Sequence, residues 1–285
     1  MALAGRTVRR RVLRISVPAH DGAISHAAAA DLVAAEEPLG IRIGGEAVAL
    51  TMRTPGDDID LTAGFLVSEG IVTAASDIAS IRICTGEQCG HDEHNGDVGN
   101  IADVTLQAGL PTPSWSRRNF LTSSACGVCG KASISDLLVT SGNGLLADQV
   151  RVPVAILAEL PPAMRRAQRV FERTGGLHAA GVFTADGKQL VVREDVGRHN
   201  AVDKVVGWAL QAGRLPLSGC VLVVSGRASF ELVQKAVVGG IPVLAAVSAP
   251  SSLAAELADD AGLTLVGFLR PGSMNVYTHE QRITD

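Results

Sequence analysis

The sequence has few aromatic residues: two Trp, one Tyr and six Phe among 285 residues. Its apolar share is nevertheless 47%, so the core has to be built mainly from Val, Ala, Leu and Ile. Together with 31 glycines, this composition suits an α/β protein with buried strands. The chain is long enough for one large domain or two modest domains, each with its own core.

The sequence also lacks a long apolar run. No stretch approaches the roughly 18 residues that a membrane-spanning helix needs, and no continuous apolar segment follows the basic N-terminus as it would in a secretory signal. The arginine-rich start leaves a transit peptide open. The formal net charge is −4, which gives no reason to expect nucleic acid or an anionic membrane as a partner. We therefore expect a cytoplasmic protein.

Cysteines are few as well. There are five, and cysteines in the cytoplasm stay reduced, so the odd number favours metal ligands or reactive thiols over disulfides. Two of them stand with two residues between them in "SSACGVCGKAS", residues 123–133. This spacing is shared by metal half-sites, redox dithiols and sulfur nucleophiles.

Four parts are expected along the chain: a poorly ordered N-terminus over 1–30, a small α+β domain over 31–108, a mobile connection carrying the cysteine pair over 109–149, and an α/β domain over 150–285. In the second part, Gly44-Gly45 between two apolar runs predicts a hairpin. The stretch "DDIDLTAGFLVSEG" predicts a helix that ends at Gly70. The connection is rich in Pro, Ser and Arg, and such long loops are usually functional or disordered.

After residue 150, strand-like and helix-like segments alternate. A hairpin is expected to turn on Asp186-Gly187. The later runs "GCVLVVSG", "IPVLAAVS" and "LTLVGFLR" are continuously apolar, and amphipathic segments separate them. Continuous apolar strands are typical of a sheet that is covered by helices on both faces.

Three of these strands lead into similar turns: "EDVGRHN" (194–200), "SGRASFE" (225–231) and "SAPSSLA" (248–254). A helix is expected to begin at each turn, and the free N–H groups of a helix start attract anions. Side by side, the turns would form a crevice for a phosphorylated ligand at the carboxyl ends of the strands. Ser225 supplies a hydroxyl there, and Arg198 and Arg227 are candidates to grip a phosphate.

The same residues have a simpler interpretation. Ser and Asp cap many helices, and the two arginines would then point into water. His199 is likewise either a base or ligand-binding donor, or a surface residue at a helix start. The sequence contains neither GxxxxGK[ST] nor GxGxxG, so it predicts no ordinary P-loop or dinucleotide fingerprint.

The cysteine pair is best interpreted as a thiol site. The residues after it, "KASISDLLVTSG", predict a short helix, so Cys126 and Cys129 lie near a helix N-terminus with Lys131 close by. Both features lower a thiol pKa and favour the thiolate. The small flanking residues leave room for another molecule, and we therefore expect an accessible nucleophile.

Metal binding is the main alternative for these cysteines. The insertion "CTGEQCGHDEHNGD" adds possible zinc ligands, either alone or together with the pair: Cys84, Cys89, His91 and His94. The order H-x-E followed by C-x-x-C also mimics the zinc deaminase signature. However, Ala125 stands where that signature has proline, and the His-containing segment is too polar and glycine-rich for a buried helix. A redox dithiol is also open, although no strand rich in β-branched residues directly precedes the pair.

Taken together, these segments resemble one known family. The ordered series includes "DLTAGFLVSEGIV", "SSACGVCGK", "VVREDVGRHNAVDKVVG", "VVSGRASFELVQKA" and "GIPVLAAVSAPSSLA". It runs from about residue 31 to near the C-terminus and is similar to the formate dehydrogenase accessory sulfurtransferases. These are sulfur carrier proteins required for active molybdenum- or tungsten-dependent formate dehydrogenases.

The resemblance implies a persulfide relay. Members of the family take sulfur from a cysteine desulfurase and deliver it to the molybdenum cofactor before the cofactor enters formate dehydrogenase. The matching cysteines here are Cys126, expected to carry the persulfide, and Cys129. The client is the bis(molybdopterin guanine dinucleotide) form of the cofactor, and no permanent cofactor or metal is expected. The family's C-terminal binding segment falls on Phe268, Leu269, Arg270, Pro271, Gly272 and Ser273.

The resemblance also implies an architecture. We expect a three-layer, cytidine-deaminase-like sandwich in the C-terminal domain, a smaller α+β N-terminal domain and a homodimer. Two features depart from the pattern: the insertion after residue 83, and Pro271, which removes a backbone donor from the binding segment. A non-catalytic molybdenum cofactor chaperone and a zinc-dependent deaminase-like hydrolase remain the alternative functions.

Overall fold

The structure is a computed structural model that describes residues 5–18, 23–85, 100–108 and 144–285. Cys126, Cys129 and most of the predicted connection lie outside the described residues. The same is true of Cys89, His91 and His94 in the insertion. The site is therefore built below from the folded framework that the described ranges form.

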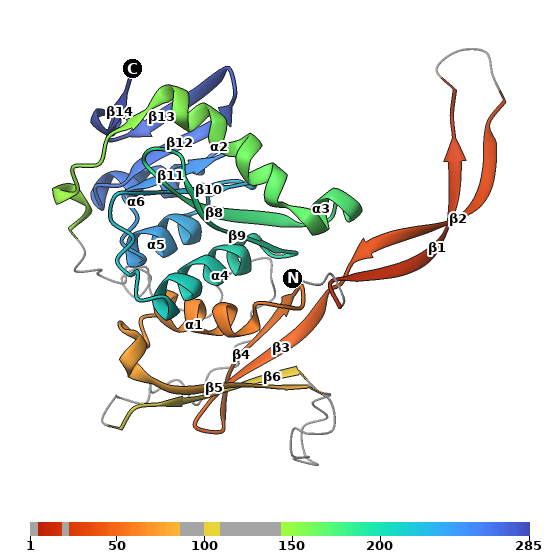
Figure 1. Ribbon diagram of the computed structural model, residues 1–285, viewed down its shortest axis with the longest axis horizontal. Coiled ribbons are helices and arrows are strands. Elements are labelled where there is room, and N and C mark those ends of the chain that lie inside the picture. Colours follow the sequence, from red (N-terminus) through yellow and green to blue (C-terminus); the bar gives the residue numbers. More distant parts are fainter. Residues whose placement is uncertain (1–4, 19–22, 86–99, 109–143) are drawn as a thin grey trace.

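A six-stranded mixed sheet forms the centre of the molecule, in the order β13-β12-β11-β10-β8-β9 (Figure 1). Its strands are β8 (His178–Thr184), β9 (Gln189–Asp195), β10 (Cys220–Val224), β11 (Val243–Ala246), β12 (Thr264–Arg270) and β13 (Ser273–Thr278). Strands β10, β11 and β12 run parallel, whereas β8 and β13 are antiparallel to their neighbours. The predicted hairpin is present, and Gly187 in its turn has φ +84°.

Helices cover both faces of this sheet (Figure 1). On one face lies α2 (Val154–Ala167), and on the other lie α4 (Arg198–Gln211), α5 (Phe230–Val238) and α6 (Ser252–Asp260). Within β10, Val221 and Val223 belong to the core under α2, while Leu222 and Val224 belong to the core under α4 to α6. This alternation explains the continuous apolar run and confirms the prediction of a mixed α/β fold. The specific likeness to cytidine deaminases stays a prediction.

A second, four-stranded sheet has the order β4-β3-β6-β5. It contains β3 (Glu37–Ile43), β4 (Glu46–Arg53), β5 (Ile78–Thr85) and β6 (Asn100–Leu106), and α1 (Asp58–Ser68) lies between this sheet and α4 (Figure 1). The predicted turn glycines Gly44 and Gly45 have φ +58° and +87°, and Gly70 ends the helix region with φ +71°. Each sheet draws its strands from one predicted domain.

The two sheets nevertheless share one core, because α1 and α4 touch backbone to backbone. A Cβ atom added at Gly64 would lie 1.8 Å from the carbonyl oxygen of Asp203, and one added at Gly207 would lie 1.8 Å from that of Asp60. Only glycine allows this approach. One buried apolar cluster accordingly includes residues of the four-stranded sheet, α1, α4 and the six-stranded sheet.

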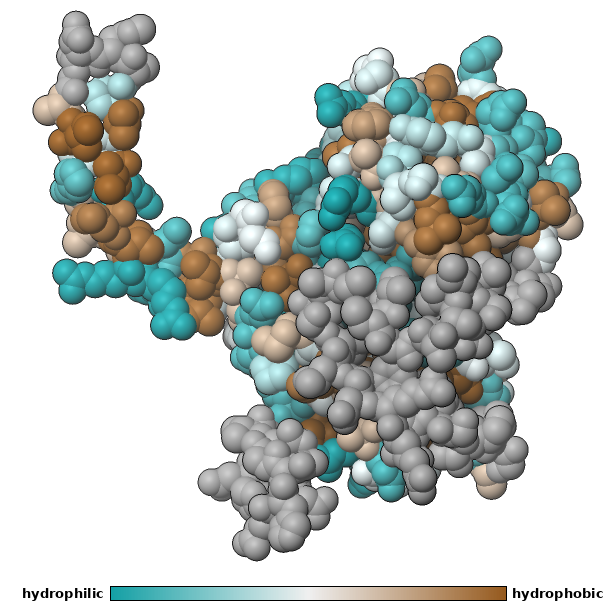
Figure 2. Space-filling view, turned by 180° about the vertical axis from the view of Figure 1, so that it is seen from behind, coloured by the Kyte–Doolittle hydropathy of each residue, from teal (hydrophilic) through white to brown (hydrophobic). Residues whose placement is uncertain are grey.

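The N-terminus differs from the expected poorly ordered segment. Strands β1 (Thr7–Ser16) and β2 (Ser25–Ala34) pair in antiparallel register from Thr7↔Ala34 to Ser16↔Ser25. They form an arm that projects from the body (Figure 1), and apolar side chains lie along it (Figure 2). The prediction was wrong because it ignored the β-branched residues of β1, which favour extended backbone, and the partner strand that satisfies its backbone groups.

Sequence analysis also missed the helices before β8. Pro161 and Pro162 lie inside α2, and proline normally argues against a helix interior. The short α3 (Arg169–Thr174) follows, and two-stranded pairing joins β7 (Val152–Pro153) to β14 (Ile283–Thr284). Three 3₁₀ helices, Ala75–Asp77, Leu145–Ala147 and Glu280–Arg282, complete the described elements.

The end of the predicted mobile connection is anchored. Leu145 is 4% exposed, and its carbonyl accepts a hydrogen bond from the buried guanidinium of Arg282. The Asp148 carboxylate accepts the N–H of Gly219 at 2.9 Å. Residues 144–149 therefore belong to the body, which moves the end of the expected connection to the boundary of the described residues.

The close approach of α1 and α4 predicts a large effect of a single methyl group. Gly64→Ala or Gly207→Ala should destabilise the protein by about 3 kcal/mol or more, since backbone atoms rather than flexible side chains obstruct the new Cβ. Urea unfolding followed by circular dichroism would measure the loss. Gly144→Ala is the control, because Gly144 has φ −59° and no atom within 4 Å of an added Cβ. Equal stabilities of all three variants would contradict the packing described.

Candidate functional site

The strand ends meet as predicted. Because β10, β11 and β12 are parallel neighbours and β9 runs in the same direction beyond β8, the turns that begin α4, α5 and α6 share one edge of the sheet. Backbone hydrogen bonds join the turns before α5 and α6 to each other and to β12: Ala228 N–H donates to the carbonyl of Ala249 at 3.2 Å, and Phe268 N–H to that of Ser248 at 3.1 Å. The first residue of β8, His178, lies among them.

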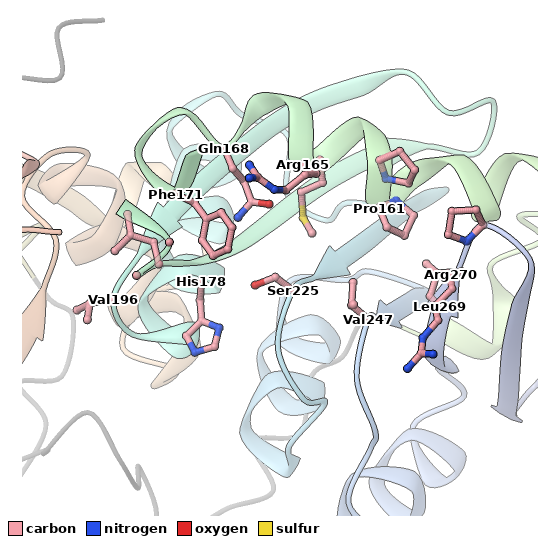
Figure 3. A pocket seen from close by; sticks show the side chains of 16 residues that line it. Pro161, Arg165, Gln168, Phe171, His178, Val196, Ser225, Val247, Leu269 and Arg270 are labelled. Carbon is pink, nitrogen blue, oxygen red and sulfur yellow. The ribbon is translucent and has the colours of Figure 1, made fainter. Parts of the chain in front are cut away.

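A cavity of about 750 Å³ opens at this edge, under α2 and α3 (Figure 3). Its lining residues are Pro161, Pro162, Met164, Arg165, Gln168, Phe171, Gly175, Gly176, Leu177, His178, Val196, Ser225, Val247, Leu269, Arg270 and Pro271. None of these described residues is acidic, and two are arginines. The size lies in the range of small-molecule sites, and the charge suits an anionic ligand.

The structure brings only some of the predicted site residues to this cavity. Four of them line it: Ser225, Leu269, Arg270 and Pro271. Gly272 and Ser273 are exposed where β12 turns into β13, and Phe268 is 37% exposed with a left-handed φ of +52°. Arg227 is exposed and does not line the cavity, which matches the simpler interpretation that this arginine points into water.

Arg198 lies behind the cavity rather than in it. A Cβ added at Gly226 would lie 3.4 Å from Nδ1 of His178 and 3.5 Å from Cδ of Arg198, so this glycine makes room for both side chains. The buried Nε of Arg198 has no hydrogen-bond partner within the described ranges. The positive charge of Arg198 therefore stands close to His178, and it lowers the pKa of that histidine.

His178 and Ser225 form the floor of the cavity. The Ser225 hydroxyl oxygen accepts the N–H of Ala179 at 2.9 Å, which leaves the hydroxyl proton available to a ligand, and this oxygen points toward His178 (Figure 3). Burial lowers the pKa of His178 below its usual value, and the charges of Arg198 and His199 lower it further, against the opposing effect of Asp195. Sequence analysis missed His178, whose only signal is its position at the start of a strand beside two candidate turns.

His199 is neither in the cavity nor on the surface. Its Nε2 lies 2.6 Å from Oε2 of Glu231 and 3.4 Å from the hydroxyl of Ser229, and both paired side chains are mostly buried. Burial raises the pKa of Glu231, but the hydrogen bond from His199 and the charges of His199, Lys235 and Arg198 outweigh it, so the net shift is downward. This pair links the start of α4 to the start of α5.

A buried ion pair holds the first of the three turns. Lys204 Nζ lies 2.7 Å from the Asp195 carboxylate, and both side chains are 0% exposed. Asp195 also accepts the N–H groups of Gly197 and Thr54 at 2.8 and 3.1 Å, and Lys204 donates to the Thr54 carbonyl at 2.9 Å. The feature of the sequence that points to this buried ion pair is Lys204 itself, a lysine beside the apolar residues of "NAVDKVVG".

The remaining cysteine and metal candidates add no site within the described ranges. Cys220 is buried, and burial followed by the charge of Asp148 raises its thiol pKa, so it is a weak nucleophile. Cys84 on β5 is half-buried and free of disulfides. No group of three His, Cys, Asp or Glu side chains among the described residues is placed to hold a metal.

Within the same ranges, no helix is both long and apolar enough to span a bilayer.

The lowered pKa of His178 predicts a pH dependence of stability. Because the folded state binds this proton less readily than the unfolded state, stability should fall as pH drops below about 6.5, the unfolded value. His178→Asn should therefore lose less stability than the unmodified protein between about pH 7.5 and about pH 5.5. Urea unfolding at both pH values tests this, with His26→Asn, at an exposed position on β2, as the control. Identical losses in the unmodified protein and His178→Asn would contradict it.

Comparisons with known proteins agree on one family. The sequence profile of the FdhD/NarQ family matches residues 34–284. "Sulfur carrier protein FdhD" of Mycolicibacterium paratuberculosis is 56% identical over 97% of this chain and 98% of its own. The protein of the same name from Nocardia farcinica is 53% identical over 99% and 96%. A crystal structure described as a formate dehydrogenase accessory protein of Desulfotalea psychrophila matches with a TM-score of 0.68 and 26% identity, covering 96% of this chain and 99% of that one.

Proposed function

Because the chain belongs to the FdhD/NarQ family, we propose that it is a sulfur carrier that serves the maturation of a formate dehydrogenase. The observation that carries this proposal is the 56% and 53% identity, over nearly the whole chain, to two proteins named sulfur carrier protein. The similar crystal structure belongs to a protein described as a formate dehydrogenase accessory protein, which links that relative to the same enzyme. The paired cysteines of "SSACGVCGK" supply the sulfur chemistry that such a function needs.

The chemistry is a persulfide relay from a cysteine desulfurase. The Cys126 thiolate attacks the outer sulfur of the desulfurase persulfide, a new S–S bond forms on Cys126, and the desulfurase cysteine leaves as a thiolate. The exchange is neutral in electrons and needs no external oxidant or reductant. Cys129 follows Cys126 by three positions in the sequence, close enough to assist release of the sulfur.

The substrate that receives the sulfur is the molybdenum cofactor in its bis(molybdopterin guanine dinucleotide) form. Two properties of the cavity support this choice: its volume of about 750 Å³ and the absence of acidic side chains among its described lining residues. A dinucleotide carries pyrophosphate groups, which arginine binds well. Arg270 in the lining is suited to hold them, and Arg198 behind His178 adds a second positive charge near this end of the sheet.

His178 and Ser225 would complement these arginines. A neutral imidazole and a hydroxyl whose oxygen already accepts a backbone hydrogen bond can both donate to a phosphate oxygen. An approaching anion also favours the protonated imidazole, so bound pyrophosphate would raise the pKa of His178. The homodimer and the cytoplasmic location implied by the family resemblance belong to the same proposal.

The sulfur carrier proposal predicts a covalent adduct. After incubation with a cysteine desulfurase and cysteine, the protein should gain one reducible sulfur atom, because the Cys126 thiolate accepts it. Intact-protein mass spectrometry should show this gain for the unmodified protein and for Cys220→Ala, and no gain for Cys126→Ala. The Cys220→Ala control removes a thiol that is buried in the core.

Two results would reject this mechanism. An adduct that persists in Cys126→Ala would place the sulfur on another residue. Full formate dehydrogenase activity in cells that carry only the Cys126→Ala/Cys129→Ala double variant would instead favour a chaperone that binds the cofactor without moving sulfur.

A further inference from the structure

The arm formed by β1 and β2 carries an apolar face that the rest of the described chain leaves open. Side chains alternate across a strand, and the antiparallel register of the two strands is unbroken. Leu13, Ile15 and Val17 therefore lie on one face, and they are 62%, 52% and 73% exposed. Ile24, 59% exposed, continues this face on the opposite side of the arm. Figure 2 shows apolar side chains along the arm, and an exposed patch of this kind marks an interaction surface.

The body of the protein holds the arm only at its root. The Arg6 guanidinium lies 2.7 Å from the Asp57 carboxylate, and the N–H of Ala35 donates to the carbonyl of Arg6 at 2.9 Å. Neither apolar core contains a residue from the described part of the arm, which projects away from the body in Figure 1. Two paired strands alone are only marginally stable in water. The arm therefore gains stability when another molecule covers its apolar face.

The charge of the arm favours an acidic surface as its partner. Residues 7–34 contain four arginines and two aspartates, a net charge of +2 with His neutral, so the rest of the chain has a net charge of −6. On the apolar face itself, Arg9 and Arg11 lie nearer the root than Leu13. The described residues of this face include no acidic side chain. The body of a second copy of this chain offers the complementary charge.

Two other ways to cover the face fit these observations less well. Packing two arms against each other by this face would bring two positive surfaces together with no acidic group between them. Insertion of the arm into a membrane would also bury the polar residues "HDG" (20–22), which connect the two strands in the sequence. Docking on an acidic protein surface avoids both costs.

We propose that the arm of each copy docks on the body of a second copy, with its four exposed aliphatic side chains as apolar contacts and with Arg9 and Arg11 facing acidic groups of that body. The inference rests on the homodimer that belongs to the proposed function, and it assigns the surface that forms this homodimer. In a twofold-symmetric pair both arms are used, so the assembly closes at two copies. Each arm then obtains the packing that two strands alone lack.

Sedimentation analysis of the full chain tests the apolar contact. The unmodified protein should form a dimer of about twice the 29.4 kDa chain mass. Leu13→Thr/Ile15→Thr should weaken this dimer about a hundredfold or more, because the symmetric pair loses four apolar contacts. Threonine keeps the preference for extended backbone, and circular dichroism should show an unchanged fold. The matched control is Val8→Thr/Val33→Thr, at 40% and 39% exposed positions on the opposite face, which should leave the dimer intact.

Salt dependence separates docking on the body from packing of arm on arm. The affinity of the dimer should fall as the NaCl concentration rises from about 50 mM to about 500 mM, because salt screens the attraction between opposite charges. Arg9→Gln/Arg11→Gln should weaken the dimer about tenfold or more at the lower concentration and reduce its salt dependence. An affinity that rises with salt would show that like charges meet, and it would overturn docking on the body.

The remaining outcomes also decide. A dimer that survives Leu13→Thr/Ile15→Thr, or an equal loss in the control pair, would show that another surface forms it. An unmodified protein that stays monomeric would overturn the inference, and binding of that monomer to vesicles of anionic phospholipid would assign the arm to a membrane instead. None of these results affects the sulfur carrier proposal, which the persulfide adduct on Cys126 tests independently.

Discussion

Two successive carboxylates at the end of β9 organise the framework around the cavity. Side chains alternate across a strand, so Glu194 and Asp195 point to opposite faces of the sheet. Glu194 accepts the N–H groups at the start of α3 and thereby positions Phe171 in the cavity wall. Asp195 binds Lys204 of α4 and the backbone of residue 54, which joins the cavity edge to the four-stranded sheet. The buried ion pair is tolerated because hydrogen bonds satisfy its remaining polar atoms.

The core and the cavity edge differ in how well their polar groups are satisfied. Behind the edge, Asp195 and Lys204 have several partners each. At the edge itself, the buried Nε of Arg198 has none among the described residues, and burial lowers the pKa of His178. Unsatisfied and perturbed groups of this kind concentrate where a protein binds its ligand. The stable network behind the edge holds them in place.

The sequence predicted most of the second half of the fold because local pattern and tertiary environment agree there. Continuous apolar runs such as "GCVLVVSG" correspond to strands covered on both faces. The prediction from sequence failed where the local pattern and the tertiary environment disagree. Pro161 and Pro162 hid α2, and strands β1 and β2 pair with each other although most of their side chains are exposed. Since α2 and α3 were missed, the wall formed by Arg165, Gln168 and Phe171 was missed with them.

By itself, the sequence determined the family resemblance, the strand-end crevice and the cysteine pair, because each depends on residue type and spacing within short segments. Only the tertiary structure decided which side chains share a cavity. It placed Ser225 and Arg270 in the cavity with His178 and Gln168, left Arg227 outside it, and buried His199 against Glu231. The physical reason is that the cavity joins segments from residue 161 to residue 271, and their meeting depends on strand order and helix packing, which no local pattern encodes.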